Sequence, residues 1–230
     1  IGPLRHLVCS YHVPLFFFAS GYFYKEYKTS VLGMKLFKSL IMPYFIACIA
    51  LFISKKIAGE SYSILEYLTK IVFADGYYNK TMIGADMPII GKLWFLPALF
   101  WCRIVYNRVA KVPCNLYYVI TITVLSYLCG RYVVNLPFGI LEGTQGLMMY
   151  AFGRYANNYK KYFAKRFAIL ILLILWGYHF YLGGFSMANF EYCNFILNYL
   201  GAISACIIIL LGVKKYHSKT CLKLPSMALS

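Results

Sequence analysis

Apolar residues in this chain fall into seven runs that are separated by shorter polar stretches. The runs cover residues 4–24, 36–54, 92–110, 115–130, 136–153, 167–183 and 196–213. A helix that crosses a bilayer needs roughly 20 predominantly apolar residues, so the longer runs are typical of membrane spans. Two of the shorter runs, 115–130 and 136–153, can form a hairpin whose ends are sheltered by neighbouring helices. The pattern predicts an all-α fold, a polytopic transmembrane bundle of about seven helices.

The first run has two chemically different ends. It carries His12 near one end, and a stretch with four lysines, residues 25–38, follows the other end. If the helix begins at Leu4, His12 lies about two turns inside it. Pro14 then predicts a kink or a fresh helix start, and Ser20-Gly21 predicts a close approach of another backbone.

The longest polar stretch, residues 55–91, is predicted to be a loop outside the cytoplasm. Within it, residues 64–73 are moderately amphipathic and are expected to lie along the membrane interface. Residues 75–91 are rich in Gly, Asp and Asn, and two interpretations stay open for them: a lid or acceptor platform over the outer mouth, or a plain connector.

Composition excludes a soluble globular domain. Of the 230 residues, 61% are hydrophobic and only 13% are charged, and the mean hydropathy is +0.65. The net charge of +16 would suit a nucleic-acid partner, but the positions of the basic residues argue against one. When the loops are assigned alternately to two sides, 16 of the 23 basic residues share one side. They are Lys25, Lys28, Lys35, Lys38, Arg103, Arg108, Lys111, Arg154, Lys160, Lys161, Lys165, Arg166, Lys214, Lys215, Lys219 and Lys223.

This asymmetry predicts the orientation of the bundle. Loops rich in Lys and Arg stay in the cytoplasm, so the basic side is predicted to be cytoplasmic and the first helix to enter from outside. The chain starts with Ile1 directly at a helix mouth, and we expect it to be an internal piece of a larger membrane protein. The eight cysteines show no metal-ligand spacing and are interpreted as small buried residues; Cys9 and Cys193 are the pair near the outer face.

Three ionisable residues are predicted to lie in the outer third of the membrane: His12, Glu142 and His179. A buried carboxylate beside an imidazole can work as an acid–base pair, because the carboxylate supports the protonated ring. The competing interpretation is that each side chain reaches the interface or satisfies a kinked backbone. Trp94 opens its run at the headgroup level and is interpreted mainly as an interfacial anchor.

The inner end carries Lys35 and Lys38, one helical turn apart, shortly before Pro43. Two cations at the start of a helix can hold a phosphate together, aided by the free N–H groups of the helix N-terminus. On composition alone, ordinary lysines facing lipid phosphates are the simpler interpretation. No phosphate loop, nucleophile elbow or zinc motif of soluble enzymes occurs.

Four motifs in order resemble the acyltransferase-3 family of membrane acyltransferases, in its fucose 4-O-acetylase-like branch. The first begins at His12 and reads HVPLFFFASGYF, and the third begins at Leu93 and reads LWFLPAL; these two are the specific ones. The second is KLFKSLIMPY from Lys35, where the family has a basic RxxR pattern. The fourth pairs LPFG at Leu136 with YAFG at Tyr150. The resemblance covers most of the chain. It implies that residues 1–230 form one acyltransferase-like domain, which is incomplete at both ends.

The resemblance implies transfer of an acetyl group from cytoplasmic acetyl-CoA to a hydroxyl of a cell-surface or lipid-linked sugar. Lys35 and Lys38 then stand where two arginines hold the acyl-CoA phosphates, and His12 matches a second family histidine, which is assigned to acceptor binding or proton transfer. We assign His12 and Glu142 as catalytic and His179 and Trp94 to the acceptor side. Glu142 and His179 match no family motif, so their roles rest on the residues alone. The family's main catalytic histidine would precede Ile1, so these residues alone are expected to be inactive.

The resemblance also implies a bundle of about ten helices in the complete protein. The expected partners are acyl-CoA, a glycan acceptor and the lipid bilayer of a bacterial inner membrane, with no nucleic acid, no metal and no bound cofactor. Two alternatives remain: a transporter or flippase of a glycan precursor, and a non-catalytic membrane subunit, which lysine at both arginine positions would fit.

Overall fold

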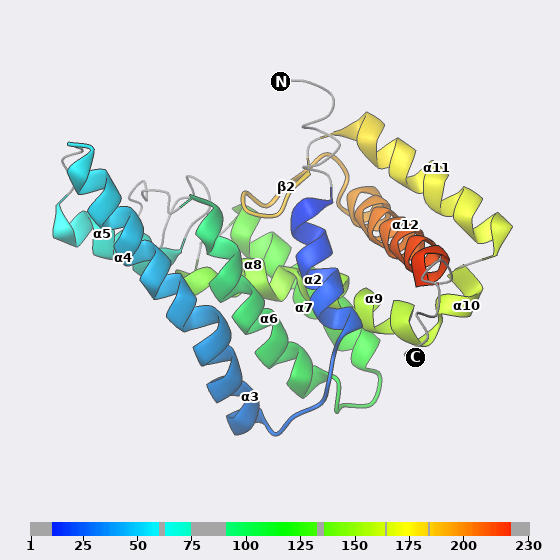
Figure 1. Cartoon of the computed structure of the whole chain (residues 1–230), viewed down its shortest axis with the longest axis horizontal. Coiled ribbons are helices and arrows are strands. Elements are labelled where there is room, and N and C mark those ends of the chain that lie inside the picture. Colours follow the sequence, from blue (N-terminus) through cyan, green and yellow to red (C-terminus); the bar gives the residue numbers. More distant parts are fainter. Residues whose placement is uncertain are drawn as a thin grey trace, which may run out of the picture.

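The computed structural model describes residues 11–59, 63–74, 91–132, 136–163, 165–183 and 185–221 (Figure 1). The helices in chain order are α2 (His12–Tyr22), α3 (Thr29–Leu36), the π-helix η1 (Phe37–Ile41), α4 (Met42–Ile57), α5 (Ile64–Phe73), the 3-10 turn η2 (Gly91–Trp94), α6 (Phe95–Val109), α7 (Asn115–Tyr132), the 3-10 turn η3 (Pro137–Gly139), α8 (Ile140–Gln145), α9 (Leu147–Asn158), α10 (Lys160–Phe163), α11 (Arg166–Leu182) and α12 (Phe195–Cys221). Two short strands, β1 (Phe185–Ser186) and β2 (Glu191–Tyr192), lie between α11 and α12.

The helical prediction is confirmed in its main lines. Each of the seven apolar runs contains a helix, and the amphipathic stretch 64–73 is the helix α5. The runs 115–130 and 136–153 form the predicted hairpin, since α7 packs against α8 and α9. The loop stretch 75–90, the proposed lid, and Cys9 lie outside the described residues.

Two helix boundaries differ from the prediction. The helix that carries His12 begins at His12 itself, with Tyr11 outside it, so the histidine is at the first helical position rather than two turns inside. The stretch 25–38 is largely helical, because a helix runs without a break from Thr29 to Ile57. The expected helix N-terminus at Lys35 is therefore wrong.

The continuous helix Thr29–Ile57 is widened where α3 joins α4. Residues Phe37–Ile41 form a π-helical turn directly before Pro43. In a regular α-helix the Pro43 ring would clash with the carbonyl four residues earlier. The wider turn relieves this clash and lets an apolar helix of 29 residues pass through a proline.

A β-hairpin, which the prediction lacked, joins α11 to α12. β1 and β2 pair antiparallel, with Phe185 opposite Tyr192. Phe190, in the connection between the strands, is fully buried and its ring lies against Gly130 of α7. The hairpin, which joins α11 to α12, therefore also contacts the C-terminal end of α7, while the described fold is otherwise all-α.

α2 crosses α9 at two glycines. A Cβ added to Gly21 would meet the backbone carbonyl of Tyr150, and one added to Gly153 would meet the carbonyl of Phe18. The two backbones are therefore in direct contact, as the Ser20-Gly21 pair predicted. This crossing places the first motif beside the fourth, although more than a hundred residues separate them in the chain.

Large apolar side chains cover the outside of the bundle. Ile46, Ile49 and Ile53 of α4 and Leu173 and Ile174 of α11 are exposed. In Thr29–Ile57, 22% of the most apolar window is buried inside the protein. Thr29–Ile57 and Phe195–Lys214 are both long and apolar enough to cross a membrane. An apolar surface of this kind requires a lipid solvent.

The described connections gather at two ends of the bundle, and their assignment to the two sides of a membrane stays a prediction. At the end that we call the basic end, residues 23–28, residues 110–114 and the C-terminal half of α9 meet: Glu26 pairs with Lys111, and Asn157 donates a hydrogen bond to the Tyr22 carbonyl. At the opposite end, Arg131 pairs with Glu191 at 3.8 Å. Figure 1 shows α3 and α10 toward the basic end and α5 and β2 toward the opposite end.

Candidate functional site

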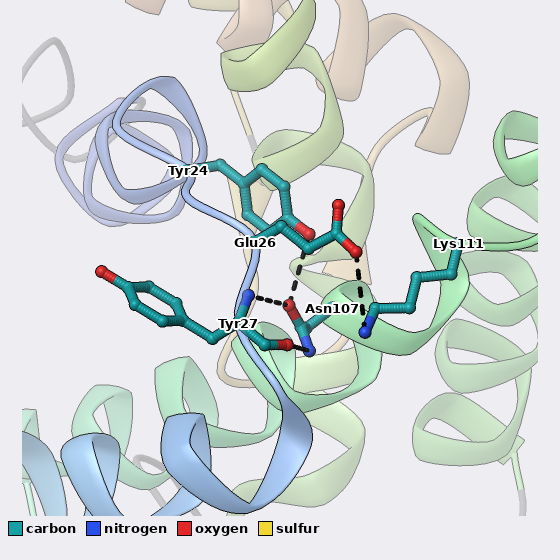
Figure 2. A network of polar contacts seen from close by, with 5 residues as sticks. All are labelled: Tyr24, Glu26, Tyr27, Asn107 and Lys111. Carbon is teal, nitrogen blue, oxygen red and sulfur yellow. Dashed lines mark hydrogen bonds and ion pairs between the residues drawn. The ribbon is translucent and has the colours of Figure 1, made fainter.

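A buried asparagine organises the basic end (Figure 2). Asn107 of α6 donates a hydrogen bond from Nδ2 to the Tyr27 carbonyl at 2.9 Å and accepts one from the Tyr27 N–H at Oδ1, at 3.3 Å. The same oxygen accepts a hydrogen bond from the Tyr24 hydroxyl at 3.3 Å. Asn107 is fully buried, so these bonds replace water for both the amide and the loop backbone. The segment between α2 and α3 is therefore fixed against α6.

An ion pair crosses the same segment but contributes little to this arrangement. Lys111 Nζ lies 3.6 Å from a Glu26 carboxylate oxygen, and both side chains are largely exposed. Exposed pairs of this kind contribute roughly 0–1 kcal/mol, because water and salt screen them. The buried amide of Asn107 is the stronger contact.

The fixed segment in turn positions one of the two predicted donor lysines. Lys35 Nζ lies 4.4 Å from the centre of the Tyr27 ring and donates a hydrogen bond of 3.4 Å to the Tyr27 hydroxyl. Lys38 lies in the π-turn and is exposed. Both cations are therefore accessible at the surface of the bundle, which suits binding of an anion. Their assignment to acyl-CoA stays a prediction.

Arg154, another cation at this end, was counted in the sequence only as a topology signal. The Arg154 guanidinium carbon lies 4.7 Å from the centre of the Tyr24 ring and 5.9 Å from that of Tyr106. Burial raises the pKa of Tyr24 above its ordinary value, and the nearby Arg154 charge opposes part of this rise. Tyr24 therefore keeps its proton at neutral pH and remains a hydrogen-bond donor to Asn107.

Glu142 lies in the interior of the bundle. It belongs to α8, which packs against α6 and α7, and its side chain is only 1% exposed. Thr144 of the same helix receives a hydrogen bond of 2.7 Å from Ser126 of α7. A carboxylate at this depth fits the expectation of a buried acid; its catalytic role stays a prediction.

One turn after Glu142, Gln145 presents a buried amide. The side chain is 0% exposed, and neither Nε2 nor Oε1 makes a hydrogen bond to a described residue. Its backbone carbonyl accepts a hydrogen bond of 3.0 Å from the Tyr199 hydroxyl of α12. The Tyr192 hydroxyl is also buried, and its geometry gives no hydrogen bond to a described residue. The interior therefore holds hydrogen-bonding capacity that the described protein groups do not use.

His179 joins α11 to α12. Its Nδ1 lies 3.2 Å from Asn198 Nδ2, and Asn198 also donates to the Gly183 carbonyl at 3.1 Å. The imidazole packs edge-on against the Phe185 ring, and it is buried. Because an amide nitrogen can only donate, Nδ1 is the acceptor and the proton is assigned to Nε2. These contacts place His179 in a helix pair different from the α6–α7–α8 group that surrounds Glu142.

His12 and Trp94 complete the predicted residues. His12 is half-buried at the first position of α2. Trp94 is 6% exposed and packs in the hydrophobic core, so the interfacial anchor expected at this position is not what the structure shows. The 3-10 turn Gly91–Trp94 that precedes α6 brings the indole into the core. An acceptor role for either residue stays a prediction.

Comparison with protein families is decisive for the whole chain. The family model for an acyltransferase domain matches residues 2–230. The chain belongs to the acyltransferase-3 family. Members are polytopic membrane acyltransferases, so this chain is a membrane transferase that takes an acyl group from a donor. No curated protein and no solved structure matches it significantly. The described residues contain no group of three or more His, Cys, Asp or Glu side chains arranged to hold a metal ion.

Proposed function

We propose that the protein is an O-acetyltransferase of a bacterial inner membrane. It takes acetyl from acetyl-CoA at the basic end and delivers it to a hydroxyl of a cell-surface or lipid-linked sugar. The observation that carries this proposal is the fixed position of Lys35. Asn107 holds Tyr27 in place, and Lys35 contacts the Tyr27 ring. A cation held in advance binds an anion at a lower entropic cost. CoA is the acyl donor whose phosphates suit such a site.

The chemistry needs a base, and His12 is the residue that we assign to it. The sugar hydroxyl oxygen attacks the thioester carbonyl carbon while the imidazole of His12 accepts the hydroxyl proton. The carbon–sulfur bond then breaks, and the CoA sulfur takes up that proton and leaves as the thiol. Glu142 supports the protonated imidazole. Acetyl-CoA is a substrate here, and no cofactor enters the reaction.

The two ends of the bundle have different tasks in this proposal. Donor binding by Lys35 and Lys38 at the cytoplasmic side and acceptor binding near His12 and His179 at the outer side would let acetyl cross without CoA. Cysteine-accessibility labelling of Lys35→Cys and His12→Cys tests this arrangement. Labelling of both positions by a membrane-impermeant reagent from the same side would contradict it.

The function is tested with membranes that contain the full-length protein and labelled acetyl-CoA supplied from the cytoplasmic side. We expect base-labile label in the glycan fraction, and at least tenfold less label in Lys35→Ala/Lys38→Ala, since each cation adds a charge-assisted contact to phosphate. Lys25→Ala/Lys28→Ala is the matched control, because it removes the same charge from the same end. A transporter would make no covalent product. A wild-type protein that does not bind CoA would favour the non-catalytic subunit.

A further inference from the structure

Arg103 lies inside an apolar helix. It precedes Val109, the last residue of α6, by six positions, which is about 9 Å along the helix axis. An arginine at membrane depth is costly and is retained where it has a partner or a function. Among the described residues no carboxylate pairs with it, and its Nε is buried without a hydrogen bond. The described protein groups therefore leave this charge without a counterion.

Arg154 of α9, like Arg103, has no counterion among the described residues. Its Nη1 is buried and makes no hydrogen bond to a described residue, and no described carboxylate pairs with it. Its guanidinium carbon lies 4.7 Å from the centre of the Tyr24 ring and 5.9 Å from the centre of the Tyr106 ring. Cation–π contacts of this kind fix a guanidinium without neutralising its charge.

One cluster of tyrosines connects the two arginines. The ring centres of Tyr106 and Tyr150 are 4.8 Å apart, and those of Tyr24 and Tyr106 are 5.3 Å apart. Arg103 lies close enough to the Tyr150 hydroxyl, and Arg154 to the Tyr106 hydroxyl, for each positive charge to act on that group. Two guanidinium groups and several hydroxyl donors thus lie together at the basic end. We call this group the arginine–tyrosine cluster; it consists of Arg103, Arg154, Tyr24, Tyr106 and Tyr150.

The charge balance of this cluster favours an anion. The described carboxylate nearest to it in the chain is Glu26, which acts on Tyr24 but pairs with Lys111. Among the residues that the structure describes, no carboxylate compensates the two positive charges of the arginine–tyrosine cluster. Guanidinium groups bind phosphate oxygens with two parallel hydrogen bonds, a geometry that Lys35 and Lys38 cannot supply.

We propose that Arg103 and Arg154 together bind a phosphate group of a ligand that enters from the basic end. Two sources share this chemistry: the phosphates of CoA and the headgroup of an anionic lipid. If the source is CoA, the inference rests on the proposed function, and the two arginines add bidentate phosphate contacts to those of Lys35 and Lys38. If it is a lipid, the site stands independently of that function.

The experiment uses the full-length protein in nanodiscs of phosphatidylcholine and measures CoA affinity. We expect Arg103→Gln and Arg154→Gln each to weaken CoA binding at least tenfold, and Arg108→Gln, an exposed arginine of the same helix, to stay within twofold. In parallel, melting is compared between phosphatidylcholine and phosphatidylglycerol nanodiscs. If the two variants bind CoA normally but lose a stabilisation by phosphatidylglycerol that wild type and Arg108→Gln show, the phosphate belongs to lipid.

Wild-type protein provides a test that does not depend on the folding of a variant. CoA or phosphatidylglycerol should protect Arg103 and Arg154, but not Arg108, from phenylglyoxal, as read by peptide mass spectrometry. Unchanged CoA affinity in both variants, together with an unchanged lipid effect and no protection, overturns the inference. Failure of wild type to bind CoA would instead count against the proposed donor, while the lipid comparison would still decide on the arginine pair.

Discussion

Asn107 binds both backbone polar groups of Tyr27, 80 residues away in the chain, through the two ends of one amide. Asn107→Ala would leave the Tyr27 N–H and carbonyl without these partners. We expect a loss of about 2 kcal/mol in the free energy of unfolding, since each hydrogen bond contributes about 1 kcal/mol. Equilibrium unfolding in mixed micelles measures it. Asn158→Ala, at an exposed position, is the control, and equal stabilities of the two variants would contradict this role.

Gly153→Ala is expected to separate α2 from α9, because its Cβ would meet the Phe18 carbonyl. The predicted loss is about 1–3 kcal/mol, typical of overpacking in a close-packed interior. Gly177→Ala in α11 is the matched control, since nothing lies within 4 Å of its Cβ, and it should be neutral or stabilising. A Gly153 variant that melts like the Gly177 variant would show that the crossing tolerates a methyl group.

Replacement of His12 and replacement of His179 are expected to have different effects on activity and stability. His12→Ala should reduce acetyl transfer by about 100-fold or more and leave CoA affinity unchanged, as removal of a general base does. His179→Ala should chiefly lower the melting temperature, because the imidazole joins α11 to α12 through Asn198. Activity assays on variants that retain CoA binding separate the two roles. A stable His179→Ala protein without activity would reverse this assignment.

Gln145→Leu is expected to keep or raise stability, because the amide that it removes has no described partner. If this amide bonds the acetyl carbonyl or the sugar hydroxyl in passage, transfer should fall at least tenfold. Thr123→Val is the matched control: its hydroxyl is also buried without a described partner, on α7, and its loss should leave transfer unchanged. A clear drop in stability of Gln145→Leu would show that the amide serves the protein itself.

The raised pKa of Tyr24 predicts a pH dependence of stability. Only the neutral phenol donates to Asn107, so its contribution is complete below the ordinary tyrosine pKa of about 10 and is lost as pH rises through the raised folded value. Wild type should melt above Tyr24→Phe at pH 7, and this difference should shrink above pH 10. A difference that grows with pH would contradict the sign.

Most of the fold was predictable because bilayer thickness dictates the length of the apolar runs, and Lys and Arg mark where many of these runs end. The β1–β2 hairpin was not, since strands of two residues are too short to show alternation. The start of α2 at His12 and the helical character of residues 29–36 were also missed. Pro14 and Pro43 signal a disturbance in a helix but do not say whether it is a start, a kink or a π-turn.

The candidate site was predictable only where charge stands out against an apolar run. Glu142 was visible for that reason, and the structure buries it as expected. Trp94 was placed at the interface by its position at the end of a run, whereas packing takes it into the core. Asn107 gave no local signal, because its partners are brought to it only by the folded chain. Arg103 was counted with the loop cations although it lies within α6.

The π-turn Phe37–Ile41 also fixes the angular phase between the two parts of the helix Thr29–Ile57. Each residue advances an α-helix by about 100°, and a π-turn holds roughly one residue more than an α-turn. Compared with an uninterrupted α-helix, the π-turn therefore rotates the face of α3 that carries Lys35 by about a quarter of a revolution relative to the face of α4 that buries Tyr44 and Cys48. The length of this turn, more than the identity of any residue within it, decides where Lys35 points.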